Sequence, residues 1–202
     1  MPRTSQRGGP QTRARISEAA TGLFLERGFD AVTVAEVARV AGVSSVTVFK
    51  HFPRKEDLLL DTQPEATALL RAAVRDRGPG VDVLAALRAR SVQLVDDMHA
   101  LSGVKGGSEP FFRTVASSPA LLARAREIAA ELQRTLAEEL DTDATFAGDA
   151  ELLAAFFLAG YTTVLVESAR QLIAHREHSA VVADHKARLE RMFDALCNGL
   201  AG

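Results

Sequence analysis

The stretch from Thr33 to Phe52 reads TVAEVARVAGVSSVTVFKHF and holds two short helical patterns on either side of one glycine. Thr33 and Glu36 have the spacing of a capping box, in which each residue bonds the backbone amide of the other. The first pattern is therefore predicted to begin as a helix at Thr33. Gly42 permits the left-handed turn that other residues resist, so we expect this helix to end there.

The second helix of this stretch is predicted directly after that turn. Ser44 or Ser45 can cap its first turn, and it reaches His51 or Phe52 before Pro53. Two short helices joined by a turn that contains glycine have the form of a helix-turn-helix. The second helix is too short and too polar to be stable alone, so its side chains are expected to divide between a core and a ligand.

The remainder of the chain also has helical spacing, and no stretch alternates for long enough to predict a sheet. The predicted fold class is all-α, with about nine helices. The expected helices cover residues 11–27, 33–42, 44–52, 55–75, 81–101, a short one around 111–112, 118–140, 149–176 and 179–200.

The predicted organisation has three parts. Residues 1–10 are polar and rich in glycine and proline, which predicts a disordered basic arm. Residues 11–54 form the helix-turn-helix domain, and residues 55–202 form a larger helical domain that begins with a linking helix. Pro64 is expected to kink or break that helix because proline supplies no amide hydrogen.

Charge is distributed unevenly along a chain whose formal net charge is -2. Up to Lys55 there are nine basic and four acidic residues, whereas from Glu56 onward there are 15 basic and 22 acidic ones. Only the first quarter is therefore suited to a polyanionic partner.

The stretch from about residue 13 to 60 resembles the tetracycline-repressor (TetR/AcrR-like) family of bacterial transcription regulators. The resemblance rests on ISEAATGLFLERGFDAVTVAEVARVAGVS followed by SVTVFKHFPRKEDLL. It implies a DNA-binding N-terminal domain, a helical domain for effector binding and dimerisation, and no enzymatic activity. A dimer is needed because two recognition helices must reach successive major grooves of an inverted repeat.

The resemblance also implies which residues contact DNA. Thr33 and Ser44 anchor phosphates at helix N-termini, and Ser45, Val46 and Thr47 approach base edges, where Val46 or the Thr47 methyl group can touch a thymine methyl. Phe49 stands where the family usually has a tyrosine that contacts phosphate. We therefore expect Lys50 and His51 to carry more of the backbone binding, and Lys55 matches a family lysine that commonly reaches phosphate.

Effector and dimer residues are expected in the larger domain. A mostly apolar small molecule is predicted to meet Met98, Phe111, Phe112, Phe157, Tyr161 and Thr162, although such residues at helical spacing are also typical of a core. The predicted dimer surface consists of Phe156, Gly160, Val164, Met192, Phe193 and Leu196, with the alternative that these close the core of one chain.

The predicted function is thus a cytoplasmic, dimeric regulator, usually a repressor in this family, that a small effector releases from DNA. No cofactor, metal site or membrane span is predicted, and Cys197 is expected to be a packed thiol. Asp96, His99 and the C-terminal histidines lack the paired motifs of a di-iron bundle. The alternative function is a helical sensor that acts through protein partners without binding DNA.

Overall fold

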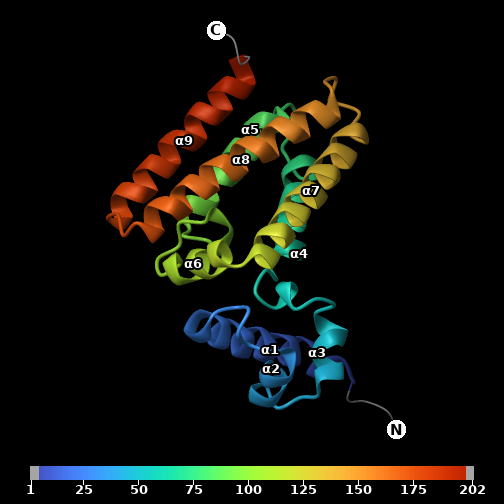
Figure 1. The fold of residues 1–202 in the computed structure, drawn as a ribbon. Helices are drawn as coiled ribbons and strands as arrows, with labels where there is room; N and C mark the ends of the chain where they lie inside the picture. Colours follow the sequence, from blue (N-terminus) through green and yellow to red (C-terminus); the bar gives the residue numbers. More distant parts are fainter. Residues whose placement is uncertain (1–4, 199–202) are drawn as a thin grey trace. The chain divides into compact units, whose positions relative to one another are not determined.

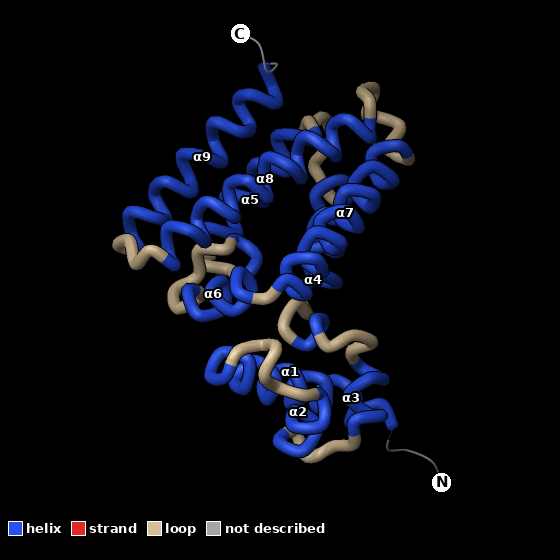
Figure 2. The backbone as a smooth tube through the Cα atoms, in the orientation of Figure 1, coloured by secondary structure: helices blue, strands red, loops and turns tan. Residues whose placement is uncertain are grey.

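The structure, a computed structural model, describes residues 5–198, and every regular element in that range is a helix (Figures 1 and 2). The all-helical prediction is confirmed. The nine α-helices of the described residues, with two short 3-10 helices η1 and η2, are α1 Ser5–Arg27, α2 Val34–Val40, α3 Ser45–His51, η1 Glu56–Leu58, α4 Gln63–Arg75, α5 Val83–Asp96, η2 Ala100–Ser102, α6 Glu109–Ser117, α7 Pro119–Asp141, α8 Ala150–Ile173 and α9 His178–Asn198.

Helix α1 begins at Ser5 and not at Gln11, so the predicted disordered arm over residues 1–10 does not hold for residues 5–10. Residues 1–4 of that arm lie outside the described residues. Helix α1 ends where expected, since Gly28 adopts φ 84° and its amide donates to the Phe24 carbonyl at 2.9 Å. A residue with a side chain would resist this left-handed conformation.

The helix predicted over 55–75 is divided. Residues Glu56–Leu58 form the single turn η1, and α4 starts only at Gln63. Pro64 lies in the first turn of α4, where its missing amide hydrogen has no helical partner to lose. The break predicted near this proline is confirmed, and it falls just before the proline.

The chain forms two compact units that do not follow the predicted boundary. One unit contains residues 1–61 together with 113–125, and the other contains 62–112 together with 126–202. Residues 113–125 join the first unit through polar contacts: the Arg124 guanidinium donates to Asp57 at 2.8 Å, and Ser118 donates to Asp30 at 3.2 Å. The end of α6 and the start of α7 therefore belong with the helix-turn-helix.

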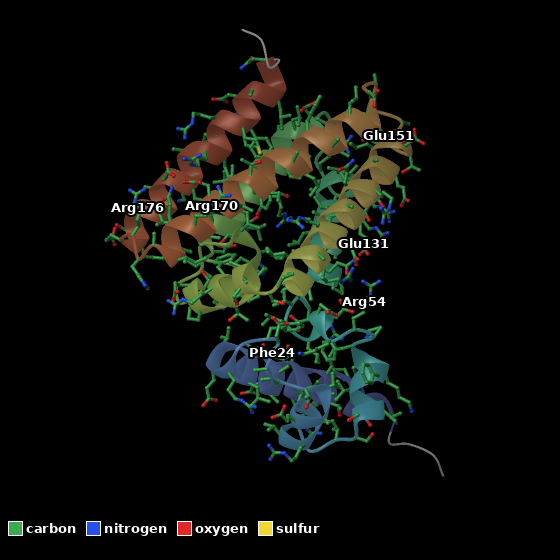
Figure 3. The ribbon with its side chains drawn as sticks, in the orientation of Figure 1. Phe24, Arg54, Glu131, Glu151, Arg170 and Arg176 are labelled. Carbon is green, nitrogen blue, oxygen red and sulfur yellow. The ribbon has the colours of Figure 1, made fainter. Side chains whose placement is uncertain are left out.

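The core of the first unit brings the three N-terminal helices together. Ile16, Ala20 and Phe24 recur every four residues along α1 and are fully buried, and Figure 3 labels Phe24. Val48 and Phe52 of α3 are also buried, at 1% exposure each. These contacts supply the hydrophobic stabilisation that a seven-residue helix such as α3 lacks by itself.

The second unit is built around α8, which packs against α9, while α5 packs against α9 and α4. Its larger core includes Leu87, Leu136, Phe157 and Phe193. Helix α8 is long and apolar enough to cross a membrane, and 28% of its most apolar 18-residue segment is buried within the fold. Core helices of soluble proteins have the same length and composition, so this is weak evidence for a membrane span. Cys197 is exposed, so the prediction of a packed thiol is wrong.

A row of polar contacts joins α4 to α7. Gln63 donates to Glu131, which Figure 3 labels on α7. Further along both helices, Arg71 and Arg75 of α4 approach the buried Glu139 of α7 at 3.2 and 2.5 Å. Because the partners advance in the same direction along both helices, α4 and α7 run parallel and are joined over most of α4.

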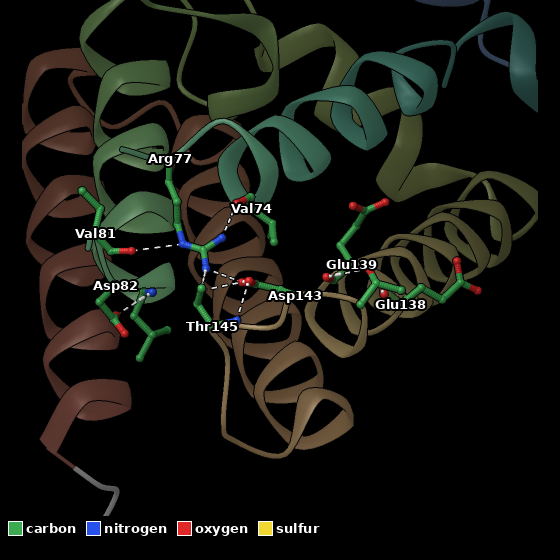
Figure 4. Close-up of polar contacts among 10 residues, drawn as sticks. Val74, Arg77, Val81, Asp82, Glu138, Glu139, Asp143 and Thr145 are labelled. Carbon is green, nitrogen blue, oxygen red and sulfur yellow. Dashed lines mark hydrogen bonds and ion pairs between the residues drawn. The ribbon is translucent and has the colours of Figure 1, made fainter. Parts of the chain in front are cut away.

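Arg77 closes the end of this row at the loop between α4 and α5 (Figure 4). Its guanidinium donates to the carbonyls of Val74 and Val81, to the Asp143 carboxylate and to the Thr145 hydroxyl. Its side chain is 12% exposed, so these partners replace the water it loses. Hydrogen bonds from Thr145 and then from Arg77 lower the pKa of Asp143, which keeps the pair charged.

The loop after α5 is fixed by contacts with α8. The Tyr161 hydroxyl donates to the Leu101 carbonyl at 3.1 Å, and burial raises the pKa of Tyr161 to about 12. Gly103 adopts φ 76°, and a Cβ atom there would lie 2.0 Å from Leu165 Cδ1. Only glycine satisfies both the backbone conformation and this close approach.

A buried polar pair joins α8 to α9. Nδ1 of His185 lies 2.8 Å from the Ser168 hydroxyl, and His185 is fully buried. Its Nε2 atom has no hydrogen-bond partner. Burial lowers the pKa of His185 to about 4, because a charged imidazolium is poorly solvated there, so the ring is neutral at pH 7.

Candidate nucleic-acid interface

The capping box at the start of α2 is confirmed. The Thr33 hydroxyl accepts from the Glu36 amide at 3.2 Å, and the Thr33 amide donates to the Glu36 carboxylate at 2.8 Å. Hydrogen bonds from Thr33, and then from Arg27, lower the pKa of Glu36 to about 2. The N-terminus of α2 is therefore already occupied by an ionised carboxylate.

This arrangement changes what we expect of Thr33. Its hydroxyl also donates to Glu36 at 2.9 Å, so both of its donors are directed at one carboxylate. A DNA phosphate placed at Thr33 would meet that negative charge. The geometry shows Thr33 holding the helix end, and the phosphate contact that the resemblance implies stays a prediction.

Ser44 caps α3, as predicted. Its hydroxyl accepts from the Thr47 amide at 3.1 Å and lies 2.9 Å from the Thr47 hydroxyl. The polar atoms of these two side chains thus bond each other at the first turn. Ser45, the first residue of the helix, is partly buried.

The outward surface of α3 is formed by Val46, Phe49 and Lys50. Val46 is 66% exposed and Phe49 is 49% exposed, and Lys50 is also exposed. Positions three and four apart are neighbours on a helix, so these three side chains share one face. The opposite face carries the buried Val48, which fixes this side toward solvent.

Arg13 was not among the predicted site residues, although it holds the end of α3 in place. Its guanidinium donates to the carbonyl of His51 at 2.6 Å and lies 4.0 Å above the centre of the Phe52 ring. Arg13 thereby ties α1 to the C-terminal end of α3, where the backbone carbonyls lack helical partners. Only its position in a basic segment could have drawn attention to it. His51 itself is partly buried.

Lys55 makes contacts within the first unit. Its ammonium donates to the Phe29 carbonyl at 2.7 Å and lies 4.2 Å from the centre of the Phe29 ring. A partly buried ammonium with these partners stabilises the turn after α1. The ammonium therefore has a contact inside the first unit, and its phosphate contact stays a prediction.

The predicted effector residues do not share one environment. Phe157 is buried, with its ring centre 5.9 Å from those of both Tyr161 and Phe193. Met98 is 41% exposed and adopts a positive φ of 48°. Phe111 and Phe112 meet edge to face at 5.4 Å, and Thr162 is partly buried. Depressions are found elsewhere, along α1 beside Asp61 and around Arg77.

The predicted dimer residues also divide. Val164 and Phe193 are 6% and 0% exposed, so they belong to the core of this chain and offer little surface to a second copy. Gly160 and Met192 pack on each other, since the Met192 sulfur lies 2.7 Å from the position of a Cβ at Gly160. Leu196 is partly buried, and only Phe156, 48% exposed, presents a large apolar surface.

No group of three or more histidine, cysteine, aspartate or glutamate side chains that could hold a metal ion occurs within residues 5–198. His178, one of the predicted C-terminal histidines, lies 2.8 Å through its Nε2 atom from the Val104 carbonyl. His185 is committed to Ser168. These two histidines thus have structural partners in the second unit.

Helices α2 and α3 form a helix-turn-helix, a motif of DNA-binding proteins, and comparison with known families identifies the class. Residues 16–62 match the model described as "Bacterial regulatory proteins, tetR family". The chain is also 30% identical over 154 residues to the HTH-type transcriptional regulator TcmR of Streptomyces glaucescens, a match that covers 72% of this chain and 68% of TcmR. The chain belongs to the TetR family of transcriptional regulators, and the predicted recognition is confirmed.

Other relatives match this chain over shorter or longer stretches. The uncharacterised HTH-type transcriptional regulator YdeS of Bacillus subtilis is 41% identical over 80 residues, and the match spans only 40% of its length and 38% of this chain. Among solved structures, the Thermus thermophilus repressor FadR, in complex with lauroyl-CoA, is 25% identical with a TM-score of 0.57. That alignment covers 94% of this chain and 95% of FadR.

Proposed function

We propose that this chain binds double-stranded DNA as a homodimer at an inverted repeat and represses transcription until a small, mostly apolar effector releases it. The observation that carries the DNA-binding proposal is the outward face of α3. Val48 and Phe52 anchor this helix, which leaves Val46, Phe49 and Lys50 directed away from the core. An α-helix presented in this way fits the major groove of B-DNA, which is about 12 Å wide.

Selection from a pool of random duplex DNA tests this proposal. We expect enrichment of an inverted repeat whose half-sites are about 34–36 Å apart, and an affinity that falls steeply with salt. Folded, dimeric protein that enriches no sequence at low salt would contradict DNA binding and favour a sensor that acts through protein partners.

Dimerisation is proposed through α8. Its exposed apolar and small residues recur along one face, at Leu152, Phe156, Ala159, Thr163 and Val166. Leu152 is 53%, Phe156 48% and Val166 42% exposed, which is a large apolar surface for one helix. Packing two such faces together would remove this surface from water.

Sedimentation of a Phe156→Glu variant tests the interface. A charge at the centre of the face should convert the dimer to monomer, whereas Arg191→Glu on the exposed side of α9 should leave the dimer intact. A Phe156→Glu protein that remains a dimer would exclude α8 as the principal contact.

The effector is proposed to act through α4 and α7 together. Gln63, Arg71 and Arg75 join α4 to α7, so a shift of α4 alone would break several polar and charged contacts. Because α7 starts in the first unit, where Arg124 bonds Asp57, motion of the joined pair is linked by the chain to the helix-turn-helix. An effector shifts this equilibrium only if it binds the DNA-incompetent state more tightly.

Lauroyl-CoA is a reasonable first probe, since FadR was solved with it and the proposed effector is mostly apolar. Titration into the protein bound to its selected operator should release the DNA if acyl groups are the effector class. Release by another apolar compound and not by lauroyl-CoA would correct the class. A compound that binds the protein without changing operator affinity is not its effector.

A further inference from the structure

Two hydroxyl groups at the start of α3 are bonded to each other. The Ser44 and Thr47 hydroxyls lie 2.9 Å apart and bond each other, and the Ser44 hydroxyl also accepts the Thr47 amide. Either hydroxyl can donate in this pair, and the Thr47 hydroxyl keeps capacity for a further hydrogen bond, so a polar contact with a base edge is compatible with the cap.

The outward face of α3 exposes two apolar side chains that the fold does not need. Val46 and Phe49 are three residues apart, at 66% and 49% exposure, while the packing of α3 is provided by Val48 and Phe52 at 1% each. Exposed apolar groups on so short a helix are available for a partner. Lys50, four residues after Val46, places a cation beside them for the DNA backbone.

Only one apolar group projects from base edges into the major groove, the C5 methyl of thymine. Resting on the DNA-binding function proposed above, we infer that Val46 and Phe49 select the operator by contacting thymine methyl groups. Val46 and Phe49 would then contribute to specificity through apolar contacts, and Thr47 also holds the cap with Ser44.

Uracil in place of thymine tests this inference, because it removes the methyl group and keeps every hydrogen-bonding atom. Each thymine of the selected operator is replaced in turn, and affinity is measured by fluorescence anisotropy. We expect one or more positions at which uracil weakens binding by about 3- to 5-fold per methyl lost. The salt slope should not change at those positions, since phosphate contacts remain.

Two truncations and one control assign the contact to residues. In Val46→Ala or Phe49→Ala the uracil penalty should fall below about 2-fold at the sensitive position, because the partner of the methyl is gone. Val40→Ala removes an equally apolar side chain, 50% exposed at the end of α2, and should keep the full penalty. Circular dichroism would verify that all three variants are folded.

The possible failures are distinct. Sequence-specific binding with no uracil-sensitive thymine, or a penalty that persists in both Val46→Ala and Phe49→Ala, would overturn this inference alone. Absence of any sequence-specific DNA binding by the wild-type dimer would overturn the proposed function and this inference with it.

Discussion

The ammonium of Lys55 lies 4.2 Å from the centre of the Phe29 ring and donates to the Phe29 carbonyl, so this lysine is part of the first unit's own structure. The nearest lysine in the sequence, Lys50, is exposed on α3. Two lysines five residues apart are thus expected to respond differently to the same substitution.

Replacement of each lysine by alanine separates these roles. Lys55→Ala should lower the free energy of unfolding by about 1–2 kcal/mol, through the lost hydrogen bond and the lost cation–π contact. Lys50→Ala should leave stability within about 0.5 kcal/mol, weaken binding to all DNA sequences and reduce the salt slope by about 1. Urea unfolding followed by circular dichroism suits a chain with no tryptophan and one tyrosine. A stable Lys55→Ala protein with a reduced salt slope would restore Lys55 as a phosphate ligand.

Phe49 offers a gain-of-contact test. Phe49→Tyr adds a hydroxyl to the far end of an exposed ring, where it can meet a phosphate while the ring itself keeps its proposed contact with a thymine methyl. We expect affinity to rise about 3- to 10-fold for the operator and for unrelated duplex alike, because a phosphate contact carries no sequence information. An increase confined to the operator would indicate that the hydroxyl reaches a base.

Replacement of Arg77 is expected to lower the free energy of unfolding more than replacement of most other charged residues of the second unit. Arg77→Met leaves Asp143 and two carbonyls without their donor, and we expect a loss of about 3 kcal/mol in the free energy of unfolding. Arg170→Met is the matched control, since that side chain is 75% exposed and its nearest carboxylate, on Glu167, is 3.8 Å away. The control should change stability by less than about 0.5 kcal/mol. Equal effects in both variants would show that the Arg77 contacts add little.

Burial of His185 gives stability a pH dependence. Its pKa is lowered from 6.5 to about 4, so the unfolded chain takes up a proton below pH 6.5 that the folded chain does not. Stability is therefore complete above pH 6.5 and falls by about 3 kcal/mol as the pH drops to 4. Between pH 6.5 and 5, above the ordinary range of carboxyl groups, His185→Gln should flatten the curve. Ser168→Ala should keep the slope, because burial and not the hydroxyl causes the shift.

Gly103 provides a comparison between two glycines of one loop. Gly103→Ala introduces a Cβ that would overlap Leu165 and also forces a positive φ, so we expect a loss of about 2–4 kcal/mol. Gly106→Ala has nothing within 4 Å of its new Cβ and should be nearly neutral. Thermal unfolding of the two variants under identical conditions measures this difference in stability. A tolerated Gly103→Ala would mean that Leu165 has another position available.

Local signals in the sequence predicted the helix ends well. The Thr33 capping box, the Ser44 cap and the stop at Gly28 depend on neighbouring residues, and each is confirmed. Long-range contacts could not be predicted in this way. Nothing near Lys55 in the sequence indicates that its ammonium faces Phe29, which lies 26 positions earlier.

The same limit applies to faces of apolar helices. Helix α8 is apolar nearly all round, so periodicity could not separate Val164, which is buried, from Val166, which is 42% exposed. The partners on α5 and α9 decide which side is covered, and their positions are set by tertiary packing. Which apolar residues of α8 are exposed could therefore not be predicted from periodicity alone.

The inclusion of residues 113–125 in the first unit means that this unit is discontinuous in the gene. A fragment that stops at Asp61 would lose Arg124 and Ser118, and with them the partners of Asp57 and Asp30. Exchanging the second unit for that of a relative therefore requires three junctions, after residues 61, 112 and 125, because a single junction after the helix-turn-helix would separate the two segments of the first unit.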